Sequence, residues 1–312
     1  MSKTSLNYKA GYDDKGAFVR RDSAFRRWVT ADGSSEFPAE AGRYHLYVSL
    51  ACPWAHRTVI MRRLKGLDDV VSLSVVDPIR DARGWAFRDV PGAQLDPING
   101  FNFLSQAYAA TEAGYDGNVT VPVLWDTATG QIVNNESSEV IRILNSAFNA
   151  YTPVTDDYYP VDLRDEIDQV NARVYPTVNN GVYRCGFARS QGAYDRAFGE
   201  LFDSLDWLEE RLATRRYLCG DRVTEADWRL FTTLLRFDAV YVGHFKTNRN
   251  RIVDMANLWG YARELYQWPG VAETVNWDHI KRHYYVTHTS INPSGIVPLG
   301  PRTDWTVPHE RG

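Results

Sequence analysis

The order of secondary-structure signals between residues 44 and 76 constrains the fold more than any other feature of this sequence. Residues 44–50 are typical of a strand, and residues 53–67 carry apolar side chains at helical spacing. A second β-rich run occupies residues 70–76. Because a single helix joins the two strands, they are expected to pair in parallel.

The next segments extend this pattern to the thioredoxin-like order of strand, helix, strand, insert, strand, strand and helix. Residues 77–117 are rich in Gly, Pro, Asp and aromatic side chains, and an irregular segment of this length is usually functional or packed on something. Residues 120–126 and 131–134 then predict a hairpin, and residues 136–146 predict a helix. Pro122 cannot donate to a ladder, so it should lie at a strand edge or start, or follow a cis bond.

The second half of the chain predicts helices and no strand. Helical spacing is found in residues 162–174, 195–212, 225–241, 251–268 and 271–285. The predicted fold class is therefore an α/β thioredoxin-like N-terminal domain plus an all-α C-terminal domain. The predicted boundaries are an N-terminal arm at 1–42 that is not a domain, a thioredoxin-like domain at 43–150 after which a linker follows, and a helical domain with a C-terminal tail at 160–312.

Composition narrows the function classes. The 312 residues include 35 Lys and Arg against 39 Asp and Glu, a formal charge of −4, which argues against a protein that coats nucleic acid. No run approaches the ~18 apolar residues of a membrane span. The first 16 residues contain no apolar run, so no secretory signal is expected, and three widely spaced cysteines indicate neither a disulfide framework nor a zinc site. A cytoplasmic location is expected.

Cys52 is the candidate nucleophile. It precedes Pro53, and a proline at the first helical position would place Cys52 at the N-cap, with its sulfur near unpaired backbone amides. The positive end of the helix and Arg57 would both favour the thiolate. A buried structural cysteine is the commoner fate of a free thiol, and that reading is preferred for Cys185 and Cys219, which lack this context.

Ala55 indicates how this thiol would be released after reaction. A dithiol oxidoreductase of this fold has its second, resolving cysteine at that position. The thiol must instead be resolved by an external small thiol, with glutathione as the first candidate. An edge at Val121-Pro122 could pair with the extended glutathione backbone, while Ser137 with its amide could take the γ-glutamyl carboxylate and Glu136 the ammonium group.

Taken together, these residues resemble the glutathione transferase superfamily, and closely its Xi class, the glutathionyl-hydroquinone reductases. The resemblance covers about residues 16–301 and is carried by the Cys-Pro-Trp-Ala tetrad at 52–55 and by residues 120–126, 134–139, 179–188 and 283–298. Gly220 with residues 224–227 matches the helix-capping segment of the wider superfamily. The resemblance implies the glutathione transferase fold, glutathione as co-substrate, no metal, and a homodimer.

The resemblance also implies a two-stage thiol exchange. Cys52 would attack the glutathionyl sulfur of a glutathionyl-hydroquinone, releasing the hydroquinone, and free glutathione would then release oxidised glutathione from Cys52. Tyr183 matches the proton donor of the family, and Tyr241 and Tyr284 match two tyrosines whose hydroxyls can hydrogen-bond the thiolate. Partners would be glutathione and a glutathionylated aromatic compound, with no nucleic acid and no membrane.

By the same matching, glutathione would be contacted by Trp85, Val121, Glu136 and Ser137. For Trp85 the alternative is a side chain that pins the insert to the body of the domain. Asn118 stands where many relatives would carry a basic residue, so a charge contact to the glycyl carboxylate is expected to be missing and binding to be weaker.

Alternatives remain in other classes. An ordinary conjugating transferase would use a Ser or Tyr hydroxyl in place of Cys52. An omega-type thiol transferase or dehydroascorbate reductase shares the cysteine, and a non-catalytic scaffold has no need for a Cys-Pro cap. His279 and His283 lie four residues apart on a predicted helix, but the glutamate of a zinc-protease motif is absent, so they are interpreted as surface histidines.

Overall fold

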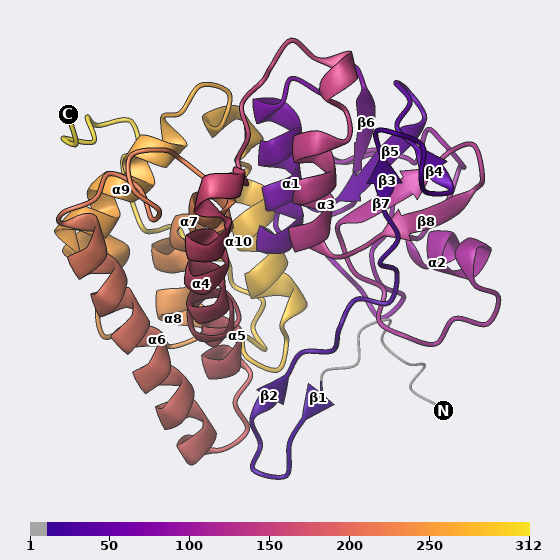
Figure 1. Cartoon of the computed structure of the whole chain (residues 1–312). Coiled ribbons are helices and arrows are strands. Elements are labelled where there is room, and N and C mark those ends of the chain that lie inside the picture. The colour runs from indigo at the N-terminus through magenta and orange to yellow at the C-terminus, as the bar shows by residue number, and fades with distance from the viewer. Residues whose placement is uncertain (1–10) are drawn as a thin grey trace, which may run out of the picture. The chain divides into compact units, whose positions relative to one another are not determined.

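A computed structural model describes residues 11–312, which group into two compact units (Figure 1). One unit, here called the sheet unit, comprises residues 21–156 and 274–287. The other, the helical unit, comprises residues 11–20, 157–273 and 288–312. The first ten residues of the predicted arm lie outside the described part of the chain.

The sheet unit is built on four strands in the order β6-β5-β7-β8. They are β5 (Tyr44–Val48), β6 (Val71–Val75), β7 (Val123–Asp126) and β8 (Gln131–Asn134). Strand β5 pairs in parallel with β6 and antiparallel with β7, and β7 pairs antiparallel with β8. The predicted parallel pair and the predicted hairpin are both confirmed. Every residue of β5 is buried, as expected for a central strand covered on both faces.

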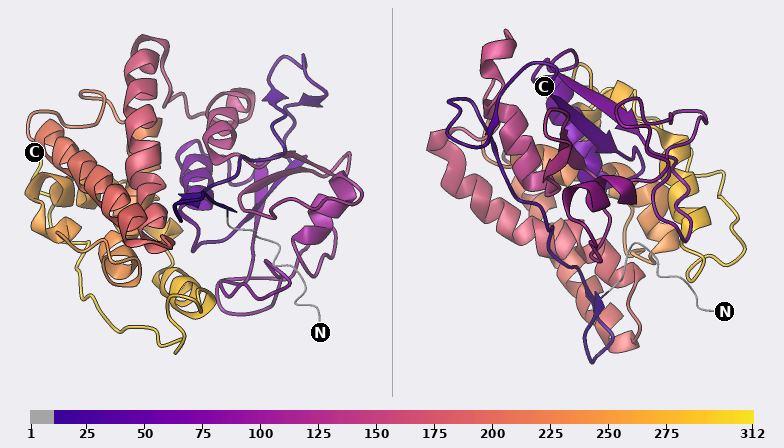
Figure 2. Two further views of the ribbon diagram at one scale, coloured as in Figure 1. Left: turned by 90° about the horizontal axis from the view of Figure 1, so that it is seen from below. Right: turned by 90° about the vertical axis from the view of Figure 1, so that its right-hand side faces the viewer.

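Helices cover both faces of this sheet. Helices α1 (Pro53–Leu64) and α3 (Ser137–Ser146) lie side by side on one face, whereas α2 (Ser105–Thr111) lies on the other, against β8 (Figures 1 and 2). The unit also includes α10 (Trp277–Thr287) from the far end of the sequence. Helix α2 was not predicted, because it buries only Ala107 and Tyr108 and has no capping side chain, so it shows little helical periodicity.

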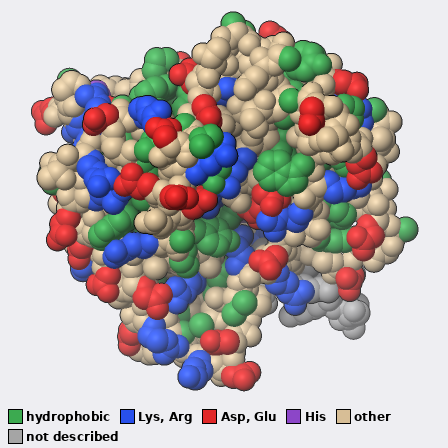
Figure 3. All heavy atoms as spheres, in the orientation of Figure 1, with side chains coloured by type: hydrophobic (Ala, Val, Ile, Leu, Met, Phe, Trp, Pro, Cys, Tyr) green, Lys and Arg blue, Asp and Glu red, His purple; other side chains and the backbone are tan. Residues whose placement is uncertain are grey.

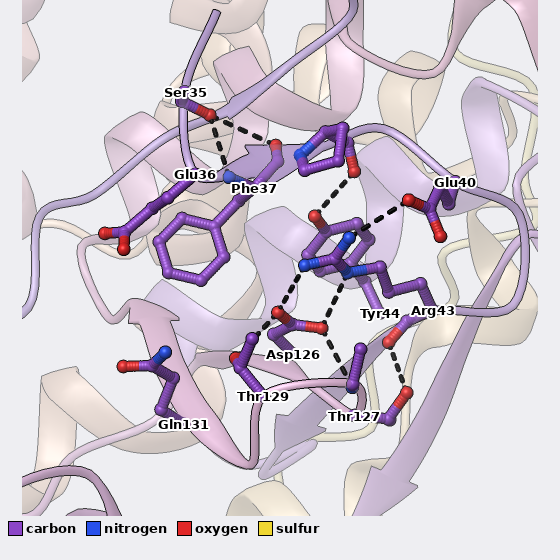
Figure 4. A network of polar contacts seen from close by, with 12 residues as sticks. Ser35, Glu36, Phe37, Glu40, Arg43, Tyr44, Asp126, Thr127, Thr129 and Gln131 are labelled. Carbon is purple, nitrogen blue, oxygen red and sulfur yellow. Dashed lines mark hydrogen bonds and ion pairs between the residues drawn. The ribbon is translucent and has the colours of Figure 1, made fainter. Parts of the chain in front are cut away.

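An ion pair ties the start of β5 to the end of β7 (Figure 4). The guanidinium of Arg43 donates from Nε and Nη2 to the two carboxylate oxygens of Asp126, each at 2.8 Å. The hydroxyl of Tyr44 donates to the Pro38 carbonyl at 2.7 Å, which attaches the arm to the same strand. A buried carboxylate needs such a partner, and the two-pronged geometry also fixes the strand pairing.

The remainder of the arm forms short strand pairs. Strands β1 (Gly11–Tyr12) and β2 (Phe18–Val19) pair antiparallel within the helical unit. Strands β3 (Val29–Thr30) and β4 (Phe37–Pro38) pair in parallel within the sheet unit. Pairs of two residues leave almost no alternation of apolar and polar side chains, which is why the sequence did not indicate them.

The helical unit contains no strand between residues 157 and 273 or after residue 287, as predicted. Its helices are α4 (Arg164–Val174), α5 (Gly181–Gly186), α6 (Gln191–Leu212), α7 (Glu225–Arg236), α8 (Val242–His244) and α9 (Ala256–Tyr266). π-helical turns at Tyr175–Asn179 and Phe237–Tyr241 join α4 to α5 and α7 to α8. Short 3-10 turns lie at Asn149–Tyr151, Val161–Leu163, Ile252–Asp254 and Ala272–Thr274.

The predicted capping segment begins α7. The Thr224 amide donates to Asp227 Oδ2 at 2.7 Å, and the hydroxyl of Thr224 donates to the same oxygen at 3.0 Å. The other carboxylate oxygen accepts from the Leu218 amide at 2.9 Å and from the Tyr261 hydroxyl at 2.8 Å. Burial raises the pKa of Asp227, and these hydrogen bonds oppose that rise. The capping prediction is confirmed.

The prediction of surface histidines on α10 is wrong. His279 is fully buried and its Nε2 lies 2.8 Å from the Pro91 carbonyl. His283 is also buried, with its Nδ1 at 2.7 Å from the Pro78 carbonyl. Helix α10 packs against the insert through these two rings, a long-range contact that spacing along the sequence does not reveal.

Charges are mixed on the surface. On the face drawn in Figure 3, the Lys and Arg side chains of the described residues are interspersed with Asp and Glu. Within residues 11–312, no helix is both long and apolar enough to cross a bilayer. The same residues contain no group of three or more His, Cys, Asp or Glu side chains arranged to hold a metal ion.

Candidate active site and glutathione site

Cys52 occupies the N-cap of α1, with Pro53 as the first helical residue. Its backbone is extended, at φ −77° and ψ 121°, and its carbonyl accepts the first helical hydrogen bond, from His56 N at 2.9 Å. Its thiol does not cap the helix but donates to the Val121 carbonyl at 3.7 Å. Cys52 is partly exposed and occupies the N-cap position that the sequence predicted.

The other two thiols have different surroundings. Cys185 and Cys219 are both free and buried. Burial raises the pKa of each thiol to about 12. Since the thiolate is the reactive form, neither is a nucleophile at neutral pH.

Val121 and Pro122 form the edge that faces Cys52. The peptide bond between them is cis, and Pro122 immediately precedes the first residue of β7. Pro122 therefore both lies at the start of a strand and follows a cis bond, the two alternatives that the sequence offered. The Cys52 sulfur donates its hydrogen bond to the Val121 carbonyl on this edge.

Glu136 and Ser137 begin α3, as predicted. Glu136 is the N-cap: its Oε1 accepts from the Ser138 amide at 3.1 Å, and its Oε2 accepts from the Ser23 hydroxyl at 2.9 Å. Burial raises the pKa of Glu136, but the hydrogen bonds from Ser138 and Ser23 and the positive charge of Arg57 outweigh this and lower it below its usual value. The result is an ionised carboxylate at a helix N-terminus, which can bind an ammonium group beside a carboxylate site.

Two residues that the sequence did not connect with Glu136 and Ser137 contact them in the structure: Arg57 and Ser23. Arg57 was expected to act on the thiol of Cys52. Its guanidinium is buried and donates from Nη1 to the Ser137 hydroxyl at 3.3 Å. Ser23 lies in the predicted arm, 113 residues from Glu136 in sequence. No local pattern indicates such a contact, so only the fold reveals it.

Trp85 of the insert packs on His283 of α10, which is the neighbour of Tyr284 in the sequence. The indole of Trp85 is 5% exposed and stacks on His283, with ring centroids 5.0 Å apart and planes at 20°. The guanidinium of Arg80 lies 5.6 Å from the centroid of the same indole. Tyr284 is buried and meets His283 edge-on at 5.3 Å. This packing favours the alternative in which Trp85 pins the insert.

Tyr183 and Tyr241 lie together in the helical unit. Their ring centroids are 6.0 Å apart, and both pack on Phe245, at 5.3 Å from Tyr183 and 5.5 Å from Tyr241. Tyr241 ends a π-helical turn, a feature often found at functional sites because it shifts the side chains that follow. The guanidinium of Arg20 lies 5.4 Å from the Tyr183 ring centroid.

Comparison with known proteins identifies the family. Residues 51–147 match the glutathione S-transferase N-terminal domain, and residues 191–264 match the glutathione S-transferase C-terminal domain. Two curated relatives, the glutathionyl-hydroquinone reductases YqjG of Escherichia coli and PcpF of Sphingobium chlorophenolicum, are each 54% identical to the chain. The alignments cover 96% of this chain and 94% of YqjG, and 94% of this chain and 93% of PcpF.

Solved structures agree with this result. The glutathione-bound structure of YqjG superposes with a TM-score of 0.90 at 54% identity, over 92% of this chain and 96% of that one. The Xi glutathione S-transferase of Phanerochaete chrysosporium superposes with a TM-score of 0.92 at 49% identity, over 96% of each chain. The fold class predicted from the sequence is confirmed. The chain belongs to the glutathione transferase family and, within it, to the Xi-class group of the glutathionyl-hydroquinone reductases.

Proposed function

We propose that this chain reduces glutathionyl-hydroquinones to hydroquinones, with glutathione as the electron donor. The observation that carries the proposal is the position of Cys52: a partly exposed thiol at the start of α1, with Ala55 where a resolving cysteine would stand. The names of two relatives with 54% identity support the same reaction.

The reaction takes place in two balanced steps. The Cys52 thiolate attacks the glutathionyl sulfur, a sulfur–sulfur bond forms, the carbon–sulfur bond to the ring breaks, and the ring carbon takes up a proton. The thiolate of a second glutathione then attacks the mixed disulfide, forms oxidised glutathione and returns Cys52 to the thiolate. The thioether sulfur of the substrate and the thiol of one free glutathione thereby become one disulfide, and the ring carbon gains the two electrons.

Each remaining residue takes the role that the family resemblance implies. Tyr183 supplies the proton to the ring carbon, and Tyr241 and Tyr284 donate hydrogen bonds to the Cys52 thiolate. Tyr241 and Tyr284 are both buried, so their hydroxyls do not exchange hydrogen bonds with bulk water.

Glutathione binding uses the groups at the start of α3 and the edge before β7. Glu136 and Ser137 hold the γ-glutamyl end, and the ionised state of Glu136 supports its role as the partner of the ammonium group. Val121 pairs with the cysteinyl backbone, and Asn118 lies toward the glycyl end, where it offers no positive charge. Trp85 is assigned the role of holding the insert through its stacking on His283, and not a contact with glutathione. The enzyme acts as a cytoplasmic homodimer.

Mass spectrometry of the intact protein after incubation with oxidised glutathione tests the exchange route. We expect a single glutathione adduct, which disappears in the Cys52→Ser variant and persists in the matched Cys185→Ser variant. Cys52→Ser should also abolish the release of hydroquinone from a glutathionyl-hydroquinone. An unmodified wild-type protein would leave the scaffold alternative standing, and a preference for dehydroascorbate over the glutathionyl-hydroquinone would favour the omega-type alternative.

A further inference from the structure

A buried tyrosine in the insert contacts both segments that are proposed to bind glutathione. Tyr108 lies on α2, in a segment that the sequence predicted to be irregular, and its side chain is fully buried. Burial raises the pKa of its hydroxyl, which therefore remains protonated and can donate as well as accept.

The Tyr108 hydroxyl is bonded on two sides. It donates to the Thr120 carbonyl at 2.8 Å and accepts from the Thr120 amide at 3.1 Å. It also accepts from the side-chain amide of Asn135, Nδ2, at 3.0 Å. The Thr120 side-chain hydroxyl also lies 3.3 Å from it, so every hydrogen-bonding contact of the Tyr108 hydroxyl is with Thr120 or Asn135 among the described residues.

Each of these partners is the immediate neighbour of a proposed glutathione contact. Thr120 precedes Val121, whose carbonyl accepts from the Cys52 sulfur. Asn135 precedes Glu136, the N-cap of α3. We propose that the Tyr108 hydroxyl is a positioning group that sets the spacing between the cysteinyl-binding edge at Val121 and the γ-glutamyl-binding cap at Glu136. This inference rests on the proposed function, because it takes those two segments as the glutathione site.

Neighbouring contacts restrain the same two segments. The Tyr115 hydroxyl donates to the Asn118 carbonyl at 3.0 Å, and its ring lies 5.0 Å from that of Tyr108. Asn135 is also hydrogen-bonded to Phe25 of the arm. Its side-chain Oδ1 accepts from the Phe25 backbone amide at 2.9 Å, and its backbone amide donates to the Phe25 carbonyl at 3.0 Å. The Asn135 side-chain amide also donates directly to the Thr120 hydroxyl at 3.3 Å, and the Tyr108 hydroxyl adds shorter bonds to both segments, at 2.8 Å to the Thr120 carbonyl and 3.0 Å from Asn135.

The effect of losing this hydroxyl follows from the groups it satisfies. Replacing Tyr108 by Phe leaves the partly buried amide and carbonyl of Thr120 and the buried side-chain amide of Asn135 each one bond short, and such groups move or admit water to recover their bonds. A shift of either segment separates contacts that one glutathione molecule must make at the same time. We expect glutathione to bind about tenfold more weakly to Tyr108→Phe, as measured by calorimetry.

The matched control is Tyr44→Phe. Tyr44 is also fully buried and its hydroxyl donates to a backbone carbonyl, that of Pro38, in the same sheet unit. The Tyr44→Phe variant should have a lower melting temperature but an unchanged affinity for glutathione. Equal losses of affinity in Tyr108→Phe and Tyr44→Phe, or no loss in Tyr108→Phe, would overturn the inference.

A second measurement separates positioning from general damage to the site. The rate at which Cys52 forms a mixed disulfide is measured with oxidised glutathione and with bis(2-hydroxyethyl) disulfide, which has no γ-glutamyl arm. Tyr108→Phe should slow the first reaction about tenfold and leave the second unchanged; equal slowing of both would contradict a positioning role. If wild-type protein binds glutathione but does not reduce glutathionyl-hydroquinones, the proposed function fails while this inference is still tested. If it binds no glutathione, both fail.

Discussion

The sulfur of Cys52 is hydrogen-bonded to the carbonyl oxygen of Val121 at 3.7 Å, across 69 residues of sequence. One group lies at the start of α1 and the other immediately before the cis Pro122 that leads into β7. A peptide-like ligand paired along the Val121 edge would therefore present its own sulfur to Cys52. The hydrogen bond between Cys52 and Val121 thus joins the candidate nucleophile to the proposed ligand-binding edge.

Only one of the three cysteines should react in the native protein. Burial raises the pKa of Cys185 and Cys219 to about 12, whereas Cys52 is partly exposed at a helix start. Titration with iodoacetamide at pH 7.5, followed by intact-mass analysis, should show one modified thiol in the native protein and three after denaturation. Cys52→Ser should show none in the native state. Modification of a second native thiol would contradict this prediction.

Tyr183→Phe should separate the two halves of the reaction. Without a donor hydroxyl the ring carbon is protonated slowly, so we expect hydroquinone release to fall on the order of 100-fold. Alkylation of Cys52 by iodoacetamide should continue at the wild-type rate. Tyr194→Phe is a matched control, because the Tyr194 hydroxyl donates to a backbone carbonyl, that of Lys246, in the same unit. Unchanged turnover in Tyr183→Phe would remove Tyr183 from its assigned role.

Glu136→Gln should weaken glutathione binding without altering the thiol chemistry. The hydrogen bonds from Ser138 and Ser23 and the charge of Arg57 lower the pKa of Glu136 in spite of its burial, so the wild-type group carries a negative charge that glutamine lacks. We expect about a tenfold rise in the KM for glutathione and little change in kcat. Glu139→Gln, one turn further along α3 and paired with Arg26, provides the control. A similar KM for both variants would refute the assignment.

The stability of the protein should fall as the pH drops through the histidine range. Burial lowers the pKa of His45 from 6.5 to about 4 in the folded protein. The unfolded chain therefore binds more protons between these values, and the free energy of unfolding decreases as the pH falls from 6.5 to 4. The shift corresponds to about 3 kcal/mol for His45.

Urea unfolding at several pH values measures this effect. His45→Gln removes the titrating group, while its side chain retains a polar partner for the Ser72 hydroxyl that lies 2.6 Å from His45 Nδ1. The variant should show a flatter dependence of unfolding free energy on pH over the same interval. Parallel slopes for wild type and His45→Gln would rule out His45 as the cause.

The helix starts at Cys52 and Glu136, compared with helix α2, show what local sequence can and cannot predict. The pattern of strand, Cys-Pro, helix and strand placed Cys52 at the N-cap, and Glu136-Ser137 was placed correctly at the start of α3, because caps and apolar periodicity are properties of neighbouring residues. Helix α2 was missed because its seven residues bury too few side chains to produce a periodic signal. Its Tyr108 therefore went unnoticed.

Long-range contacts were the other source of error. The sequence predicts surface positions for His279 and His283, since nothing in their own segment shows that the insert covers α10. The hydrogen bond from the Arg57 guanidinium to Ser137, 80 residues away, is another contact that the local sequence does not indicate. In each case the partner comes from a distant segment.

The sequence by itself determined the order of the elements, the N-cap position of the thiol and the family to which the chain is similar, because these depend on residue types at short spacing. The tertiary structure decided which charges and hydroxyls surround the proposed glutathione contacts: Ser23 and Arg57 at the start of α3, and Tyr108 bonded to Thr120 and Asn135. Hydrogen bonds and ion pairs require approach to about 3 Å, and only folding brings groups so far apart in the chain within that range.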